Sequence, residues 1–354
     1  MPEGDTEEGA LSLLDSDFEE VRAVQAEGAA EEAQEASRVE RLGYVDNEDP
    51  MGDEEILALL GLGGDDDITP APESTVAEAV EEEDPQASAA VAALAAVGHP
   101  YYEQPYGTSI PSFYAMITRR HMHEYGTTRE QLAQMAVTTR DHAVRHPNAH
   151  MTKPITAEEV INSKPIAEPL NILDCCLISD AGGAYIVTEA ERAKDLKSDP
   201  VYLLGIGEYH THEHLMCADS LTEFGAVESG RRAYNMAGLG PADMDFAELY
   251  DCFSVVPMIE MEELGLCERG GAGAMVEAGN TRIDGQLPIN THGGMLSHAH
   301  AGAAGGLFGI IEAVRQLRGQ EGKRQVASHD VALVHNEGGI LSSHCTMILG
   351  REER

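Results

Sequence analysis

The stretch NTHGGMLSHAHAGAAGG, residues 290–306, contains three histidines and five glycines ahead of an apolar segment. The apolar spacing that follows it predicts a helix over residues 303–317. Glycine lets a backbone approach a ligand closely, and the N-terminus of a helix favours anions. A histidine at such a place can lower the pKa of a thiol or donate to an oxyanion. This stretch therefore predicts a candidate site that favours a negatively charged group at the start of a helix.

Strands and helices alternate around this stretch, which predicts an α/β fold. Apolar, β-branched runs predict strands at residues 172–177, 184–188, 246–249, 331–334 and 341–348, the first two around a turn at residues 179–183. Helical spacing begins near residue 113 and predicts further helices at residues 127–146, from residue 156, and at residues 226–237, 253–264 and 303–317.

Acidic residues gather at the N-terminal end of the 354-residue chain, whose net charge is −39. Residues 1–84 hold about 28 acidic and about 3 basic residues. We predict that residues 1–97 form an acidic, largely disordered tail ending in a linker helix at residues 88–97. An alternative is a partner-docking tail anchored by residues 56–60. The negative charge argues against binding nucleic acid or anionic membranes.

The lengths of the apolar runs and the spacing of the cysteines argue against a membrane-spanning protein, a secreted protein and a protein with CxxC motifs. No run of about 18 apolar residues and no basic, apolar secretory start occurs, which predicts a soluble protein of the cytoplasm without a membrane span. No pair of the six cysteines has CxxC spacing, so we expect free thiols. These are Cys175, Cys176, Cys217, Cys252, Cys267 and Cys345.

Four segments in order resemble the sterol-carrier-protein branch of the thiolase superfamily. They are LDCCLISDAGGA (residues 173–184), ELYDCFS (248–254), the stretch 290–306, and HNEGG (335–339). The resemblance covers about residues 100–350. It implies a layered thiolase-like fold, with residues 98–195 as a partial N-terminal domain and loop domain. Residues 196–354 would be a complete C-terminal domain.

The resemblance also implies roles for individual residues. His300 aligns with the family histidine that serves the oxyanion hole and the nucleophile. His335 stands where the branch has its final histidine, a candidate base. Tyr250 replaces the usual histidine or asparagine, and its hydroxyl can donate to an oxyanion or transfer a proton. Substrate contacts would come from Asn290, Gly293, Gly294, Gly338 and Gly339.

The nucleophilic cysteine of the family lies early in the N-terminal domain, at a helix start. The first cysteine here is Cys175, and both Cys175 and Cys176 match family cysteines that are not nucleophiles. Residues 1–97 contain no cysteine and no α/β pattern. Three explanations are open: a truncated chain without activity, a domain completed by a partner, or chemistry that needs no cysteine.

We therefore predict a thiolase-like acyl-CoA acyltransferase of the acetyl-CoA acetyltransferase type, inactive if the nucleophile is missing. One alternative is a cysteine-independent retro-aldolase on β-hydroxyacyl-CoA thioesters, and another is a non-catalytic, partner-binding remnant. The expected partners are the acyl-CoA, a second copy of the chain and a small OB-fold, zinc-ribbon protein. No cofactor is expected besides the coenzyme A of the substrate. No metal site is expected, although His210, His212 and His214 would share a face if they lay on a strand.

Overall fold

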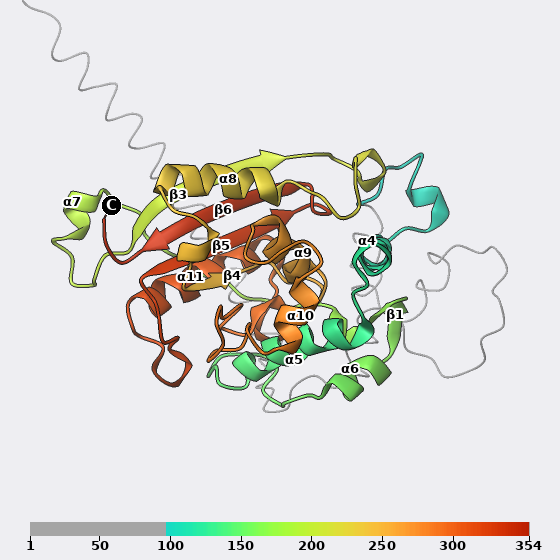
Figure 1. Ribbon diagram of the computed structural model, residues 1–354, viewed down its shortest axis with the longest axis horizontal. Coiled ribbons are helices and arrows are strands. Elements are labelled where there is room, and N and C mark those ends of the chain that lie inside the picture. Colours follow the sequence, from blue (N-terminus) through green and yellow to red (C-terminus); the bar gives the residue numbers. More distant parts are fainter. Residues whose placement is uncertain (1–96, 354) are drawn as a thin grey trace, which may run out of the picture. The chain divides into compact units, whose positions relative to one another are not determined.

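Four strands meet in one sheet in the order β3-β6-β5-β4 (Figure 1). The computed structural model describes residues 97–353. Neighbours β3 and β6 are antiparallel, as are β6 and β5, while β5 and β4 run parallel. The strands are β3 (Tyr202–His210), β4 (Phe246–Glu248), β5 (Val331–Gly338) and β6 (Ser343–Gly350). The predicted α/β class is confirmed.

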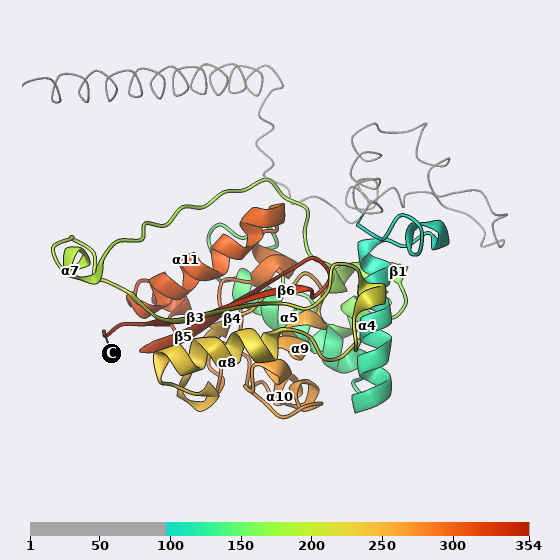
Figure 2. The ribbon, with the colours of Figure 1, turned by 90° about the horizontal axis from the view of Figure 1, so that it is seen from above.

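Helices cover both faces of this sheet (Figure 2). Helix α8 (Ala226–Ala237) packs on β3 and β6, and α11 (Gly305–Leu317) packs on the opposite face against β5 and β4. Strand β5 shows why two layers form. Val331 and Leu333 join the main core, whereas Ala332 and Val334 join the cluster beneath α11. Successive strand side chains point to opposite faces, so an unbroken apolar strand requires cover on both.

Glycines in β3 allow α8 to lie directly on the sheet. A Cβ atom on Gly207 would lie 2.0 Å from the carbonyl oxygen of Ser229, and one on Gly205 would lie 2.2 Å from that of Ala233. Both obstacles are helix backbone atoms, which cannot rotate away as a side chain can. The two glycines therefore set the distance between this helix and the sheet.

Gly207→Ala is expected to lower the free energy of unfolding by about 1–3 kcal/mol, because the added methyl group overpacks the interface. The matched control is Gly182→Ala, where nothing lies within 4 Å of an added Cβ. That change should alter stability by less than about 1 kcal/mol. Urea unfolding followed by far-ultraviolet circular dichroism measures both. Equal midpoints for the two variants would contradict this account.

Most of the remaining helices bury residues in the main core together with Val331 and Leu333 of β5. Hydroxyl caps start two of them, as the sequence predicts: Thr128 accepts from the Gln131 amide and Thr156 from the Glu159 amide, each at 3.2 Å. The elements of this part are η1 (Gln104–Tyr106), α4 (Ile110–Tyr125), α5 (Arg129–Ala143), α6 (Ala157–Asn162), β1 (Pro165–Ala167), β2 (Leu170–Asn171), α9 (Val256–Glu263) and α10 (Ala272–Glu277). Short elements elsewhere are η2 (Ile172–Asp174), α7 (Ala190–Ala193), η3 (Leu215–Cys217), η4 (Pro241–Asp243), η5 (Gly294–His298), η6 (Gly302–Ala304) and η7 (Gly322–Arg324).

The predicted strand pair at residues 172–177 and 184–188 is wrong. The first segment forms η2 and then a single isolated bridge between Cys175 and Phe253. The second lies in no strand, and its Ile186 side chain is 92% exposed. A strand requires a partner backbone, and within residues 97–353 none pairs with this segment. Conversely, β3 was not predicted, because its glycines interrupt the apolar pattern.

The predictions for the acidic tail, its linker helix at residues 88–97 and the anchor at residues 56–60 fall on residues 1–96, outside those described, apart from Val97. The proposed boundary at residues 195 and 196 stays a prediction. Within the described part, no helix combines the length and apolarity needed to span a membrane.

Candidate active site

Tyr250 and His300 form a hydrogen-bonded pair at the edge of the sheet. The Tyr250 hydroxyl lies 3.0 Å from His300 Nε2, and the two rings meet edge to face. Cys176 completes the group, with Sγ 3.6 Å from His300 Nδ1. All three residues are of intermediate burial. The structure thus brings together two of the three predicted catalytic residues.

The electrostatics of this pair fix which partner holds the proton. Burial raises the pKa of Tyr250, and the charge of Glu337 raises it further. Burial lowers the pKa of His300, although a hydrogen bond to the Leu177 carbonyl opposes this. A carbonyl only accepts, so one nitrogen of the neutral ring donates and the other accepts. We assign the acceptor to Nε2, facing the Tyr250 hydroxyl.

Asp251 holds the turn that leads to His300. Its Oδ1 accepts from the Met295 amide at 2.6 Å, and a Cβ on Gly294 would lie 1.9 Å from its Oδ2. Gly293 and Gly294 have φ of +108° and +58°, in the region that favours glycine. Both glycines are buried against protein atoms. Their observed role is to shape the turn, and substrate contact by them stays a prediction.

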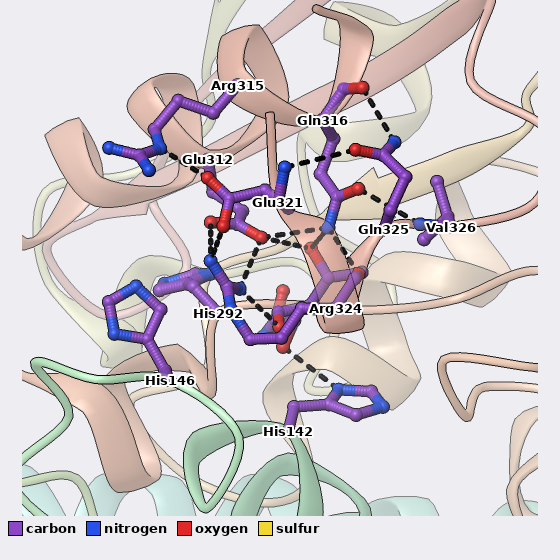
Figure 3. Close-up of polar contacts among 12 residues, drawn as sticks. His142, His146, His292, Glu312, Arg315, Gln316, Glu321, Arg324, Gln325 and Val326 are labelled. Atoms are coloured by element: carbon purple, nitrogen blue, oxygen red, sulfur yellow. Dashed lines mark hydrogen bonds and ion pairs between the residues drawn. The ribbon is translucent and has the colours of Figure 1, made fainter. Parts of the chain in front are cut away.

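Asn290 joins the same turn to the end of β4. Its Oδ1 accepts from the Leu249 amide at 2.6 Å, one residue before Tyr250. Its own carbonyl accepts from His142 Nδ1 at 3.1 Å, an approach from α5 seen in Figure 3. Asn290 is fully buried. It therefore holds the backbone next to Tyr250 in place. Substrate contact by its side chain also stays a prediction.

A buried ionic network holds the segment that precedes the turn at Gly293 and Gly294 (Figure 3). Arg324 donates to Glu312 at 2.7 Å and to the Thr291 carbonyl at 3.0 Å, and it also pairs with Glu321. Thr291 Oγ1 in turn lies 2.8 Å from Glu312 Oε1. Buried charges are stable only when paired in this way. The network anchors the segment that carries the turn and, beyond it, His300.

His335 is linked to the Tyr250 loop through Glu260, whose Oε1 lies 3.8 Å from His335 Nε2 and whose Oε2 accepts from the Tyr250 amide at 3.0 Å. It sits on β5, where its Nδ1 lies 2.8 Å from Thr346 Oγ1 and its Nε2 lies 3.2 Å from His344 Nδ1. It is 1% exposed, and burial lowers its pKa far below the usual value. Within the described residues, no direct hydrogen bond joins His335 to Tyr250 or His300. Its predicted role as a base stays a prediction.

Gly338 and Gly339 follow His335 at the end of β5 and form the turn into β6. Gly339 has a φ of +70°, which favours glycine. A Cβ atom there would lie 2.2 Å from Ser342 Oγ. The tight turn expected for these glycines is present, while substrate contact stays a prediction.

Glu337 is a residue of the site that the sequence analysis missed. Its Oε1 accepts from the Tyr114 hydroxyl at 2.5 Å and from Cys252 Sγ at 3.5 Å, and its Oε2 accepts from the Leu341 amide at 3.1 Å. Burial raises its pKa to about 7. The only sequence signal was its position two residues after His335, on the same face of a strand.

The thiols around the pair are in their protonated form. Burial raises the pKa of Cys176 to about 12, and it raises those of Cys175 and Cys252 well above the usual value. A nucleophilic cysteine requires the opposite shift. Within residues 97–353, the site therefore has a proton-transfer pair but no activated thiol.

The histidine-rich segment after β3 does not form the shared face that a strand would give. Strand β3 ends at His210, so His212 and His214 lie beyond it. His212 Nε2 lies 3.1 Å from the Ile340 carbonyl, and His214 lies 3.8 Å from Glu103. Within the described residues, no group of three His, Cys, Asp or Glu side chains is arranged to hold a metal ion.

The chain is similar in sequence and fold to several known proteins. The family model "Thiolase C-terminal domain-like" matches residues 207–351. An acetyl-CoA acetyltransferase of Methanothermobacter thermautotrophicus is 39% identical over 260 residues, which cover 73% of this chain and 68% of that protein. A steroid side-chain-cleaving aldolase of Thermomonospora curvata is 42% identical over 224 residues, covering 61% of this chain and 56% of the aldolase.

Among solved structures, the Ltp2-ChsH2(DUF35) aldolase is similar with a TM-score of 0.63 and 36% identity. The similarity covers 74% of this chain and 67% of that one. The chain thus spans between about half and two thirds of the length of the relatives it matches.

Proposed function

The chain belongs to the thiolase superfamily, in the branch of the sterol carrier proteins and thiolase-like aldolases, and from this we propose that it cleaves a carbon–carbon bond in β-hydroxyacyl-CoA thioesters. The hydrogen bond between Tyr250 and His300 carries the proposal. It is an arrangement for moving a proton, whereas the thiols beside it are held protonated. Retro-aldol cleavage needs the first and not the second.

The reaction begins with removal of the proton from the β-hydroxyl group of the substrate. The Tyr250 oxygen accepts that proton as its own passes to Nε2 of His300. The bond between the α- and β-carbons then breaks. The β-carbon leaves as a ketone or aldehyde, and the electron pair stays on the thioester as an enolate. Imidazolium returns its proton through Tyr250 to the α-carbon, which yields the shortened acyl-CoA and restores the pair.

The enolate oxygen needs stabilisation, and the start of α11 is the nearest source. A Cβ on Gly305, the first residue of this helix, would lie 3.1 Å from the His300 ring. The N-terminus of a helix carries a positive partial charge, although the Gly305 amide itself donates to the Gly302 carbonyl. We therefore assign the carbonyl oxygen of the thioester to the space between His300 and the start of α11.

The relatives support this proposal in two ways. The aldolase of Thermomonospora curvata is 42% identical to the chain over 224 residues, against 39% over 260 residues for the acetyl-CoA acetyltransferase. The similar aldolase structure contains a DUF35 protein, which supports the proposed small partner protein. Thiolase-type acyl transfer is the second candidate function, because the acetyltransferase relative is matched over a larger share of its length.

Release of a ketone or aldehyde from a β-hydroxyacyl-CoA by the purified chain tests the proposal. Hydrazine trapping detects the carbonyl product, and mass spectrometry detects the shortened acyl-CoA. We expect the rate to be unaffected by iodoacetamide, because no thiol takes part. Thiolysis of acetoacetyl-CoA that iodoacetamide abolishes would instead favour the acyltransferase. Absence of both activities would favour a partner-binding protein.

A further inference from the structure

Glu337 lies behind the Tyr250–His300 pair and takes no part in the mechanism above. Its carboxylate accepts three hydrogen bonds, from the Tyr114 hydroxyl, Cys252 Sγ and the Leu341 amide. It is 7% exposed. Cys252 stands two residues after Tyr250, so one of the donors belongs to the loop that carries the reacting phenol.

Tyr114 links this carboxylate to helix α4. Its hydroxyl is fully buried and donates to Glu337 at 2.5 Å, and its ring stacks on Phe253 at 4.5 Å between centroids. A fully buried phenol with one strong acceptor is a fixed donor. It stabilises the ionised form of Glu337 and so opposes the effect of burial on the pKa of that group.

Glu337 Oε1 lies 3.5 Å from Cys252 Sγ, two residues from Tyr250 in the same loop, so a charge on this carboxylate lies close to the reacting phenol. The carboxylate raises the pKa of the Tyr250 phenol and that of the Cys176 thiol. A negative charge near a proton acceptor strengthens its hold on a proton. When Glu337 is ionised, the Tyr250–His300 pair is therefore the stronger base.

We propose that Glu337 is a positioning residue for Tyr250, which uses its charge to set the proton affinity of the Tyr250–His300 pair and is itself tuned by the Tyr114 hydroxyl. This inference rests on the proposed function for its catalytic consequence, but not for its titration. Glu337 acts through Tyr250 and does not touch the reacting atoms.

Near neutral pH, Glu337 changes its charge, because burial raises its pKa to about 7. Proton abstraction should therefore become faster as the pH rises through about 7, when Glu337 loses its proton. Asp251 also has its pKa raised to about 7 by burial and is the main competing source of such a change. Tyr114 and Cys252 hydrogen-bond to Glu337, and His344 faces it across the strand pair. The other titratable groups that its charge influences are Cys176, Tyr250 and Glu260.

The first experiment follows the proton on Glu337 directly and needs no catalysis. Infrared difference spectra between about pH 6 and about pH 8.5 record the stretch of protonated carboxyl groups. Wild type minus Glu337→Gln should show one band that disappears near pH 7. In Tyr114→Phe the band should persist to higher pH, because the group that stabilises the carboxylate is gone. Absence of a Glu337-dependent band would overturn the proposal, whatever reaction the protein catalyses.

The second experiment measures cleavage rate against pH. In the wild type the rate should rise through about pH 7. In Glu337→Gln that rise should be lost, with a rate about tenfold lower at high pH. In Tyr114→Phe, which keeps the carboxylate, the rise should move to higher pH. A rise that survives unchanged in Glu337→Gln would assign it to Asp251 and overturn the proposal.

Urea unfolding midpoints of both variants separate these effects from loss of structure. A merely structural role for Glu337 predicts lower rates at every pH in both variants, with no movement of the pH profile. That result would also overturn the proposal. If no cleavage occurs in the wild type, the proposed function fails, and the infrared experiment still decides whether Glu337 titrates under the control of Tyr114.

Discussion

Tyr250→Phe is expected to slow carbon–carbon bond cleavage by about 10²–10⁴-fold, the range for loss of a general acid–base group. The change removes one oxygen atom and with it the hydrogen bond to His300. Phenylalanine keeps the ring, so substrate binding should change little and the loss should fall on kcat. Rates of ketone or aldehyde release at saturating β-hydroxyacyl-CoA measure it.

Four further variants make this result specific. Tyr234→Phe removes another largely buried hydroxyl, which donates to the Leu264 carbonyl at 3.0 Å, and should leave the rate unchanged. His300→Ala should match the loss in Tyr250→Phe, and the double variant should lose little more, because the two residues act as a unit. Cys176→Ser should stay active. A Tyr250→Phe enzyme with the wild-type rate would exclude the proposed mechanism.

Arg324→Ala is expected to lower the free energy of unfolding by about 3–5 kcal/mol, the cost of leaving buried charges without their partner. Arg324 is 3% exposed, and its loss would leave the buried carboxylates of Glu312 and Glu321 without this cationic partner. Because the network anchors Thr291, the turn that positions His300 should also loosen. Cleavage activity should fall with stability in this variant.

Arg315 provides the matched control for this prediction. It pairs with the same Glu321, but its side chain is 53% exposed, so Arg315→Ala should cost only about 0–1 kcal/mol. Urea unfolding followed by circular dichroism compares the two variants, since the chain contains no tryptophan for fluorescence. A similar shift of the midpoint in both would show that burial of Arg324 contributes nothing special.

Helices could be predicted well, because their residue spacing and capping residues lie within one short segment of the sequence. The helix at residues 226–237 was predicted within its observed bounds, and hydroxyl caps marked the starts of α5 and α6. Strands were harder, because pairing depends on a partner distant in the chain. Residues 184–188 have the composition of a strand but no partner among the described residues, whereas β3 pairs along its length despite its glycines.

The candidate site divides in the same way. His300 and Tyr250 could be chosen from motifs, and their contact is observed. Glu337 could not be chosen, because its importance comes from Tyr114, which lies 223 residues away in the chain. His335 has the residue type expected of a base, but its strand buries it beside His344. Motifs in the sequence identify the reactive side chains. The exposure of those side chains and their hydrogen-bond partners depend on tertiary packing.

The backbone around position 250 is held without any help from its side chain. Asn290 binds the Leu249 amide, Glu260 binds the Tyr250 amide at 3.0 Å, and Asp251 binds the Met295 amide. Among the described residues, the tyrosine hydroxyl hydrogen-bonds only to His300. For protein engineering, position 250 is thus separable from its scaffold. Histidine or asparagine introduced at position 250 would change the reacting side chain while these backbone hydrogen bonds are kept.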